Sequence, residues 1–174
     1  MSKIDKFVAK AIEIANNSKH GYDQTNRWGP DFDCSSLTYE CAHYAGYNVP
    51  TSGTRYTGTI LNDFTKIGWR ADKFDGNLFD LDKGDILLNV VNHVAIYIGD
   101  GKLVEASGNE FGGITGGKTG DQTGGEIAIR NVYNYPWDYV LTAPAEGGED
   151  SGPYDLAVAI RTCKELLAML EKMQ

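Results

Sequence analysis

The sequence is poor in positive charge and has no long apolar run. Its 174 residues carry 16 Lys and Arg against 24 Asp and Glu, which gives a formal net charge of -8. Proteins that bind nucleic acid need basic patches, so we predict no nucleic-acid partner. No stretch reaches the roughly 18 apolar residues of a membrane helix, so we predict no membrane insertion. The first residues begin an amphipathic pattern, and we therefore expect synthesis in the cytoplasm without a signal peptide.

Cysteine and histidine are also scarce, with three of each in the chain. Cys34 and Cys41 would lie two turns apart on one helix, too far for a disulfide, and the third cysteine is Cys163. The sequence has no Cys-x-x-Cys pair and its histidines are scattered, so the spacing matches no zinc site. We predict neither a metal nor a cofactor.

Hydrophobic periodicity predicts helices in the first part of the chain and strands after them. Apolar residues recur at helical spacing over 3–17 and from Cys34 to a stop at Gly46, and a short helix is expected around residues 60–61. Strands are predicted at 86–88, 94–98, 102–106, 126–130 and 139–141. This order predicts an α+β fold with N-terminal helices packed on a central antiparallel sheet.

The end of the chain has a different composition. Residues 145–153, Ala-Glu-Gly-Gly-Glu-Asp-Ser-Gly-Pro, are typical of a linker. Residues 1–144 are then the predicted domain, and 154–174 form a C-terminal helix that is too short to be a second domain. Such a helix either packs on the body of the protein or pairs with copies of itself in a homo-oligomer, and the sequence leaves both open.

Asp33-Cys34-Ser35-Ser36 places a cysteine where a loop becomes a helix. Unpaired amides and the helix dipole at a helix start favour a thiolate. We therefore expect Cys34 to be nearly exposed, to have a lowered pKa and to act as a nucleophile. Cys41 shares an apolar helix face with Leu37 and Ala45, so it is expected to be buried and inert.

His93 opens a strand-like run that continues to Gly99. The even-numbered residues of this run are apolar, which places His93 on the opposite face together with Ala95 and Tyr97. A thiol and an imidazole in these settings are the minimum parts of a cysteine-nucleophile hydrolase.

The register of the following hairpin decides where Glu105 lies. A two-residue turn at Asp100-Gly101 would pair Ile96 with Glu105 and push the carboxylate towards the core. A three-residue loop over 99–101 would pair Ile96 with Val104 and give one apolar face, so we prefer it. It leaves Glu105 on the face of His93, where a carboxylate can orient the imidazole.

Three motifs occur in one order along the chain: Asp-Cys-Ser-Ser at 33–36, Lys-Gly-Asp-Ile-Leu at 83–87, and His-Val-Ala-Ile-Tyr-Ile-Gly at 93–99. Together with Tyr22, they resemble the NlpC-type cysteine peptidases, which belong with the CHAP amidases in a papain-like superfamily. The likeness runs from about Tyr22 to Asn109, with a weaker match at 135–138. The form of residues 27–36 most resembles phage-encoded wall hydrolases.

The resemblance implies that Cys34 is the nucleophile and His93 the general base. The family's third polar residue, often a second histidine, falls twelve positions after the first, where this chain has Glu105. Because of this departure, Asn109 and Ser107 stay open as alternatives for the orienting role.

The family pattern also implies substrate contacts. Tyr22 stands at the family's tyrosine position and would line the site near the oxyanion, while Asp33 and Ser35 match residues that contact the stem peptide. The implied partner is bacterial peptidoglycan, and the implied reaction is hydrolysis of an amide bond in its stem peptide.

Several alternatives stay open at this point. An N-acetylmuramoyl-L-alanine amidase would use the same Cys/His machinery, and a catalytically silent wall-binding module would keep only the fold. A phage or prophage endolysin, released by a holin or another export route, is the preferred setting, and a secreted toxin that cuts wall peptides shares the chemistry.

Overall fold

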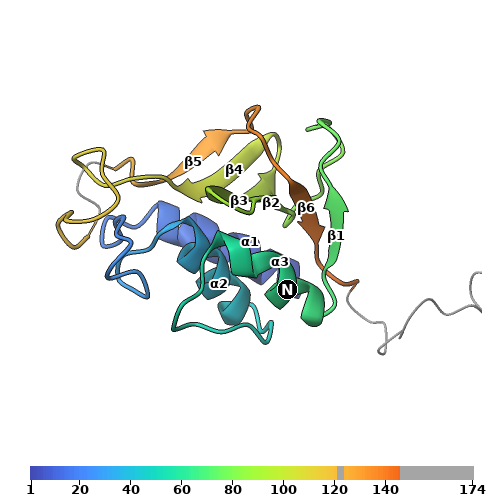
Figure 1. Ribbon diagram of the computed structural model, residues 1–174, viewed down its shortest axis with the longest axis horizontal. Coiled ribbons are helices and arrows are strands. Elements are labelled where there is room, and N and C mark those ends of the chain that lie inside the picture. Colours follow the sequence, from blue (N-terminus) through green and yellow to red (C-terminus); the bar gives the residue numbers. More distant parts are fainter. Residues whose placement is uncertain (121–123, 146–174) are drawn as a thin grey trace, which may run out of the picture. The chain divides into compact units, whose positions relative to one another are not determined.

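In the computed structural model, the three helices of the described residues precede all six strands along the chain (Figure 1). The structure describes residues 1–120 and 124–145. Over these residues the elements are α1 (Lys3–Ala15), α2 (Cys34–Tyr44), α3 (Thr57–Lys66), β1 (Arg70–Lys73), β2 (Ile86–Asn89), β3 (His93–Gly99), β4 (Lys102–Ala106), β5 (Ile127–Asn131) and β6 (Tyr139–Thr142). Met1–Pro144 form one compact unit. The predicted C-terminal helix and Cys163 lie outside the described residues, so the division into domain, linker and helix stays a prediction.

Helix α1 follows directly from its sequence. The hydroxyl of Ser2 caps the helix by accepting a hydrogen bond from the Asp5 amide at 2.9 Å. Phe7 and Ile14 are among the residues that its apolar stripe buries. The helix ends at Ala15, two residues before the predicted end. No helix in residues 1–120 and 124–145 is long and apolar enough to cross a membrane.

The six strands form one antiparallel sheet in the order β1-β6-β2-β3-β4-β5. Five of them match predicted strands to within a residue or two. The sixth, β1, was not predicted, because its sequence Arg-Ala-Asp-Lys has no apolar alternation and most of its residues are exposed. It is an edge strand, and its pairing with β6 defines it. The observed class is the α+β class that the sequence predicted.

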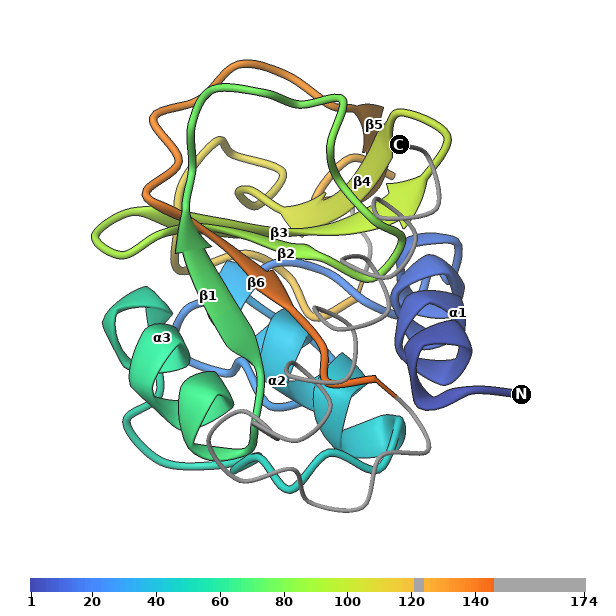
Figure 2. The same ribbon diagram turned by 90° about the vertical axis from the view of Figure 1, so that its right-hand side faces the viewer.

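The three helices lie against one face of the sheet, as Figures 1 and 2 show. The main core lies between these layers, and Phe7, Leu37 and Ile96 are among its buried residues. A smaller cluster lies on the other face. In Figure 2 that face is crossed by the segments that follow β1 and β5. The smaller cluster consists of Leu81, Leu87, Ala95, Leu103 and Trp137.

The hairpin of β3 and β4 has the predicted register but a different turn. Ile96 pairs with Val104, as expected, and Gly99 pairs with Lys102. Only Asp100 and Gly101 therefore form the turn, both with positive φ (52° and 67°), which is typical of the tightest hairpin turns. The predicted three-residue loop is wrong. The register shifts between Tyr97 and Gly99, and this bulge supplies the extra residue.

Candidate active site

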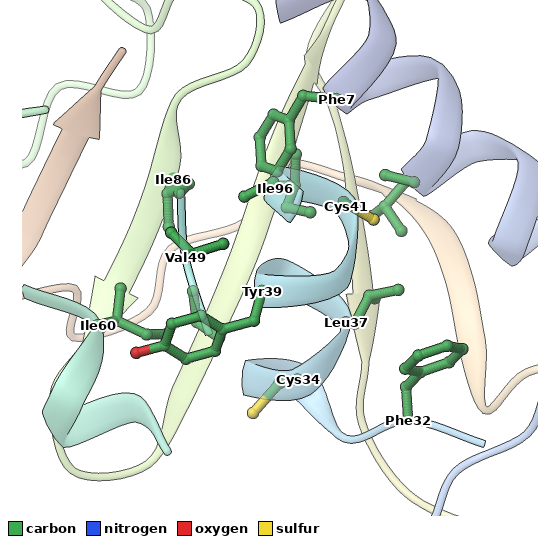
Figure 3. Packing of buried hydrophobic residues seen from close by; sticks show 14 of the residues in the cluster. Phe7, Phe32, Cys34, Leu37, Tyr39, Cys41, Val49, Ile60, Ile86 and Ile96 are labelled. Atoms are coloured by element: carbon green, nitrogen blue, oxygen red, sulfur yellow. The ribbon is translucent and has the colours of Figure 1, made fainter. Parts of the chain in front are cut away.

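Cys34 is the first residue of α2, and Asp33 fixes that start. The Asp33 carboxylate accepts a hydrogen bond from the Ser36 amide at 2.7 Å, and the Ser36 hydroxyl accepts one from the Asp33 amide at 3.0 Å. This reciprocal capping box ends the preceding loop and begins the helix at one defined residue. Figure 3 shows the Cys34 sulfur at this first turn, on the side away from Phe32.

Asp33 and Ser35 have partners within the protein. Asp33 forms an ion pair with Arg27, and the Ser35 hydroxyl donates to the Asp33 carboxylate at 2.9 Å. Arg27 also donates to Ser35 at 3.2 Å, and both Asp33 and Ser35 are buried. These bonds join the loop before α2 to the helix start. The predicted contacts of Asp33 and Ser35 with the stem peptide stay a prediction.

Cys34 is more buried than the sequence suggested, with an exposed fraction of 7%. Burial raises the pKa of its thiol to about 12, and the neighbouring Asp33 carboxylate acts in the same direction. The backbone amides of Val94 and Ser35 and the charge of Arg27 oppose this rise without outweighing it. The expectations of a nearly exposed thiol and a lowered pKa are therefore wrong. A thiolate at this position near neutral pH needs a proton acceptor beside it.

The start of β3 lies against the start of α2. The Val94 amide is close enough to the Cys34 thiol to act on its pKa, and His93 is the residue before Val94. Tyr22 lies on the same side of the structure, because the charge of Cys34 contributes to its raised pKa, about 12, after the larger effect of burial. The Tyr22 hydroxyl accepts a hydrogen bond from Gln24 at 3.0 Å. Cys34 and Tyr22 thus lie near each other, and His93 is one residue away from the Val94 amide that acts on Cys34.

His93 and Glu105 are in direct contact. The Nε2 atom of His93 lies 2.9 Å from Oε2 of Glu105, and both side chains are largely buried. Because Nε2 is occupied, Nδ1 is the ring nitrogen left to exchange a proton. No hydrogen bond to Nδ1 is found among residues 1–120 and 124–145. Glu105 thus occupies the position expected of the group that orients the imidazole.

Asn109 and Ser107, the two alternatives to Glu105, lie elsewhere in the hydrogen-bond network. The Asn109 side chain accepts from the amides of Phe111 and Gly113 and donates to the Thr115 carbonyl at 2.9 Å. It holds the shape of its own loop. The Ser107 amide donates to the Glu126 carbonyl at 3.0 Å, and the side chain of Ser107 is exposed.

Glu105 has two further partners that sequence reasoning missed. Tyr133 donates to Oε2 at 2.7 Å, and Arg130 Nε lies 2.9 Å from Oε1. Burial acts to raise the pKa of Glu105, but the hydrogen bonds from His93 and Tyr133 and the charges of His93 and Arg130 hold it below its usual value. An alternating apolar and polar pattern marked β5 as a strand, yet nothing in it indicated which residue of β4 Arg130 would face.

Two aromatic rings pack against His93. Trp137 stacks on the imidazole with a centroid distance of 5.9 Å, and Tyr135 approaches it edge-on at 5.7 Å. Asn89 fixes this segment by donating to the Pro136 carbonyl at 2.7 Å. The weak family match at 135–138 was the only signal for these rings. Within the described ranges, no three His, Cys, Asp or Glu side chains are grouped to hold a metal ion.

Comparison with known proteins agrees with the family resemblance seen in the sequence. A family model described as an endolysin-like domain matches residues 103–150. The P60 domain of an antigen from M. avium subspecies paratuberculosis has a TM-score of 0.51 at 20% identity, covering 81% of this chain and 93% of that one. No curated protein matches the chain.

Two other solved structures share the fold. The peptidoglycan hydrolase RipB from Mycobacterium tuberculosis has a TM-score of 0.52 at 16% identity, covering 82% of this chain and 65% of that one. The resuscitation promoting factor interacting protein RipA, in a form mutated at a histidine, has a TM-score of 0.53 at 16% identity, covering 81% and 62%. A second form of RipA is mutated at a cysteine. This chain therefore spans slightly less than two thirds of RipA and RipB. The fold is the papain-like α+β fold of NlpC/P60 domains.

Proposed function

We propose that this chain hydrolyses an amide bond in the stem peptide of bacterial peptidoglycan, with Cys34 as nucleophile and His93 as general base. The observation that carries the proposal is the arrangement of His93: Glu105 occupies its Nε2, and its strand begins against the helix start that bears Cys34. The likeness of the fold to a peptidoglycan hydrolase, RipB, supports the choice of substrate.

The chemistry follows from these positions. His93 Nδ1 takes the proton from the Cys34 thiol, and the thiolate attacks the scissile carbonyl carbon. When the tetrahedral intermediate collapses, the C–N bond breaks and the imidazolium gives its proton to the leaving amine. The acyl group stays on Cys34 as a thioester. Neutral His93 then takes a proton from water, and the resulting hydroxide attacks the carbonyl carbon of the thioester. The C–S bond breaks, the acid is released, and the imidazolium returns its proton to the Cys34 thiolate.

Two groups near Cys34 fit the stabilisation of the oxyanion. Apart from the Ser36 amide, which already donates to Asp33, the first-turn amides of α2 lie at the end of the helix where its dipole favours negative charge. The Tyr22 hydroxyl accepts a hydrogen bond from Gln24, so its own proton is available to donate. Because burial raises the pKa of Tyr22 to about 12, it keeps this proton at neutral pH.

Digestion of purified sacculi tests the proposal. We expect the wild-type protein to solubilise them and Cys34→Ser, which keeps the volume of the side chain, to lose activity by at least about a thousandfold. Cys41→Ala is the matched control: Cys41 is fully buried on the same helix, so this variant loses stability but keeps the reaction. Full activity of a folded Cys34→Ser protein would exclude the mechanism.

Mass spectrometry of the released fragments identifies the bond. New amino groups within the stem peptide are expected for the endopeptidase. New amino groups on L-alanine alone would identify the amidase instead. Binding to sacculi without any release, by wild type and variants alike, would identify a wall-binding module.

We further infer that the natural setting is a phage or prophage endolysin that acts on the wall after release from the cytoplasm. The match of residues 103–150 to an endolysin-like domain supports this. Expression in a bacterial host tests it: co-expression with a holin should cause lysis, and expression alone should not. Lysis without a holin would indicate another export route, such as that of a secreted toxin.

A further inference from the structure

Glu105 receives donors from three separate segments. His93 on β3 and Tyr133 after β5 both contact its Oε2, at 2.9 and 2.7 Å. Arg130 on β5 contacts the other oxygen, Oε1, at 2.9 Å. One oxygen of the carboxylate thus faces the imidazole, and the other faces a guanidinium.

The sheet register produces this arrangement. Glu105 on β4 pairs with Ala128 on β5, so Arg130 lies two residues further along the same face of the sheet. Arg130 Nη2 also donates to the Gly125 carbonyl at 3.2 Å, which holds the guanidinium in place. Its side chain is 45% exposed, so solvent weakens its charge but does not remove it.

The charges have opposite effects on His93. A carboxylate 2.9 Å from Nε2 favours the imidazolium form of the ring. A guanidinium on the far side of that carboxylate opposes the effect, because it offsets part of the negative charge that the ring experiences.

We propose that Arg130 is a positioning residue that acts through Glu105 to weaken the hold of His93 on its proton, while Tyr133 fixes the Glu105 carboxylate between them. This inference rests on the proposed function, in which His93 must both accept and return a proton. Without Arg130, the uncompensated carboxylate would hold the proton on His93 and slow its transfer to the leaving amine.

Other titratable groups lie near His93 and Glu105 and can also affect proton binding by His93. They are Tyr133 and Tyr135 in the segment after β5. Cys34 at the start of α2 lies against Val94, the residue after His93. Burial and the hydrogen bond to Glu105 raise the pKa of Tyr133 above its usual value, so it stays a donor at neutral pH. Arg130 is the cation in contact with Glu105 in the described part of the chain.

The titration of the His93 ring, followed by NMR of the intact protein, tests the inference directly. Arg130→Gln should raise the titration midpoint of His93 by about half a pH unit, and Glu105→Gln should lower it by about one unit. Arg130→Lys keeps the charge, so its His93 midpoint should stay near that of the wild type. Arg70→Gln, on the edge strand β1, is the matched control and should leave the His93 midpoint unchanged. His93→Gln assigns the signal against those of His20 and His43.

An unchanged or lowered midpoint in Arg130→Gln overturns the inference. So does an Arg130→Lys protein that titrates like Arg130→Gln, since that would assign the effect to shape and not to charge.

Hydrolysis of a soluble muropeptide gives the second readout. In the profile of kcat/KM against pH, both limbs should move to higher pH in Arg130→Gln and to lower pH in Glu105→Gln. Both limbs report proton binding by the coupled Cys34–His93 pair. If wild type hydrolyses no muropeptide, the proposed function fails. The NMR titration would still decide whether Arg130 acts on His93.

Discussion

His93 and Glu105 lie twelve positions apart in the chain, and their Nε2 and Oε2 atoms are 2.9 Å apart in the structure. The contact joins two neighbouring strands on the face of the sheet opposite to the helices. It fixes which ring nitrogen of His93 faces the carboxylate, and in the proposed mechanism the other nitrogen exchanges the proton with Cys34.

The reactivity of Cys34 should depend on His93. Burial raises the pKa of the Cys34 thiol to about 12, so a thiolate forms near neutral pH only if His93 accepts the proton. His93→Ala should therefore shift the pH dependence of alkylation by iodoacetamide upwards and slow the reaction at pH 7 by at least about tenfold. Mass spectrometry of the labelled peptide measures the rate.

Fully buried Cys41 should stay unlabelled in the folded protein and so reports unfolding in the same experiment. An unchanged pH dependence in His93→Ala would show that the imidazole does not take the Cys34 proton.

The contribution of Glu105 to stability should depend on pH. Its pKa is lowered in the folded protein, so its stabilising effect is present above the unfolded-state value of 4.5 and is lost as the pH falls through the lower folded-state value. Glu105→Gln should lower the free energy of unfolding by about 2 kcal/mol at pH 7, because a neutral amide makes weaker hydrogen bonds than the buried carboxylate. Urea unfolding at pH 7 and at successively lower pH follows this loss, and a cost that does not fall with pH would contradict the prediction.

Asp33 should stabilise the protein whatever it contributes to substrate binding. Asp33→Ala removes the cap of α2 and the ion pair with Arg27, and we expect a loss of about 2 kcal/mol. Asp33→Asn keeps a good capping side chain and should cost less. Thermal or urea unfolding ranks the variants. If the two substitutions are equally costly, the ion pair and not the cap is the main stabilising interaction.

The predicted C-terminal helix lies outside the described residues, and we propose that it joins copies of this chain. Its apolar positions at helical spacing, including Leu156, Ile160 and Leu167, suit a small bundle. The full chain should then show a larger number of subunits by light scattering than a version that ends at Ala145. Equal numbers for both would leave a helix packed on its own body as the remaining alternative.

Local patterns in the sequence were enough to predict much of the fold. Ser2 and the apolar stripe of α1, the capping residue Asp33, and the alternation in β3 all act over a few residues, which is the range that sequence periodicity reports. The pairing of Ile96 with Val104 was also predictable, because only this register keeps a carboxylate out of the main core.

Only the tertiary structure decided the environment of the candidate site residues. The burial that raises the pKa of Cys34 comes from packing across α2 and β3, and the contacts of Arg130 and Tyr133 with Glu105 depend on how β5 pairs with β4. These effects join residues far apart in the chain. Desolvation and charge act through space, so spacing along the sequence can nominate a nucleophile and a base, whereas their proton affinities depend on the packed structure.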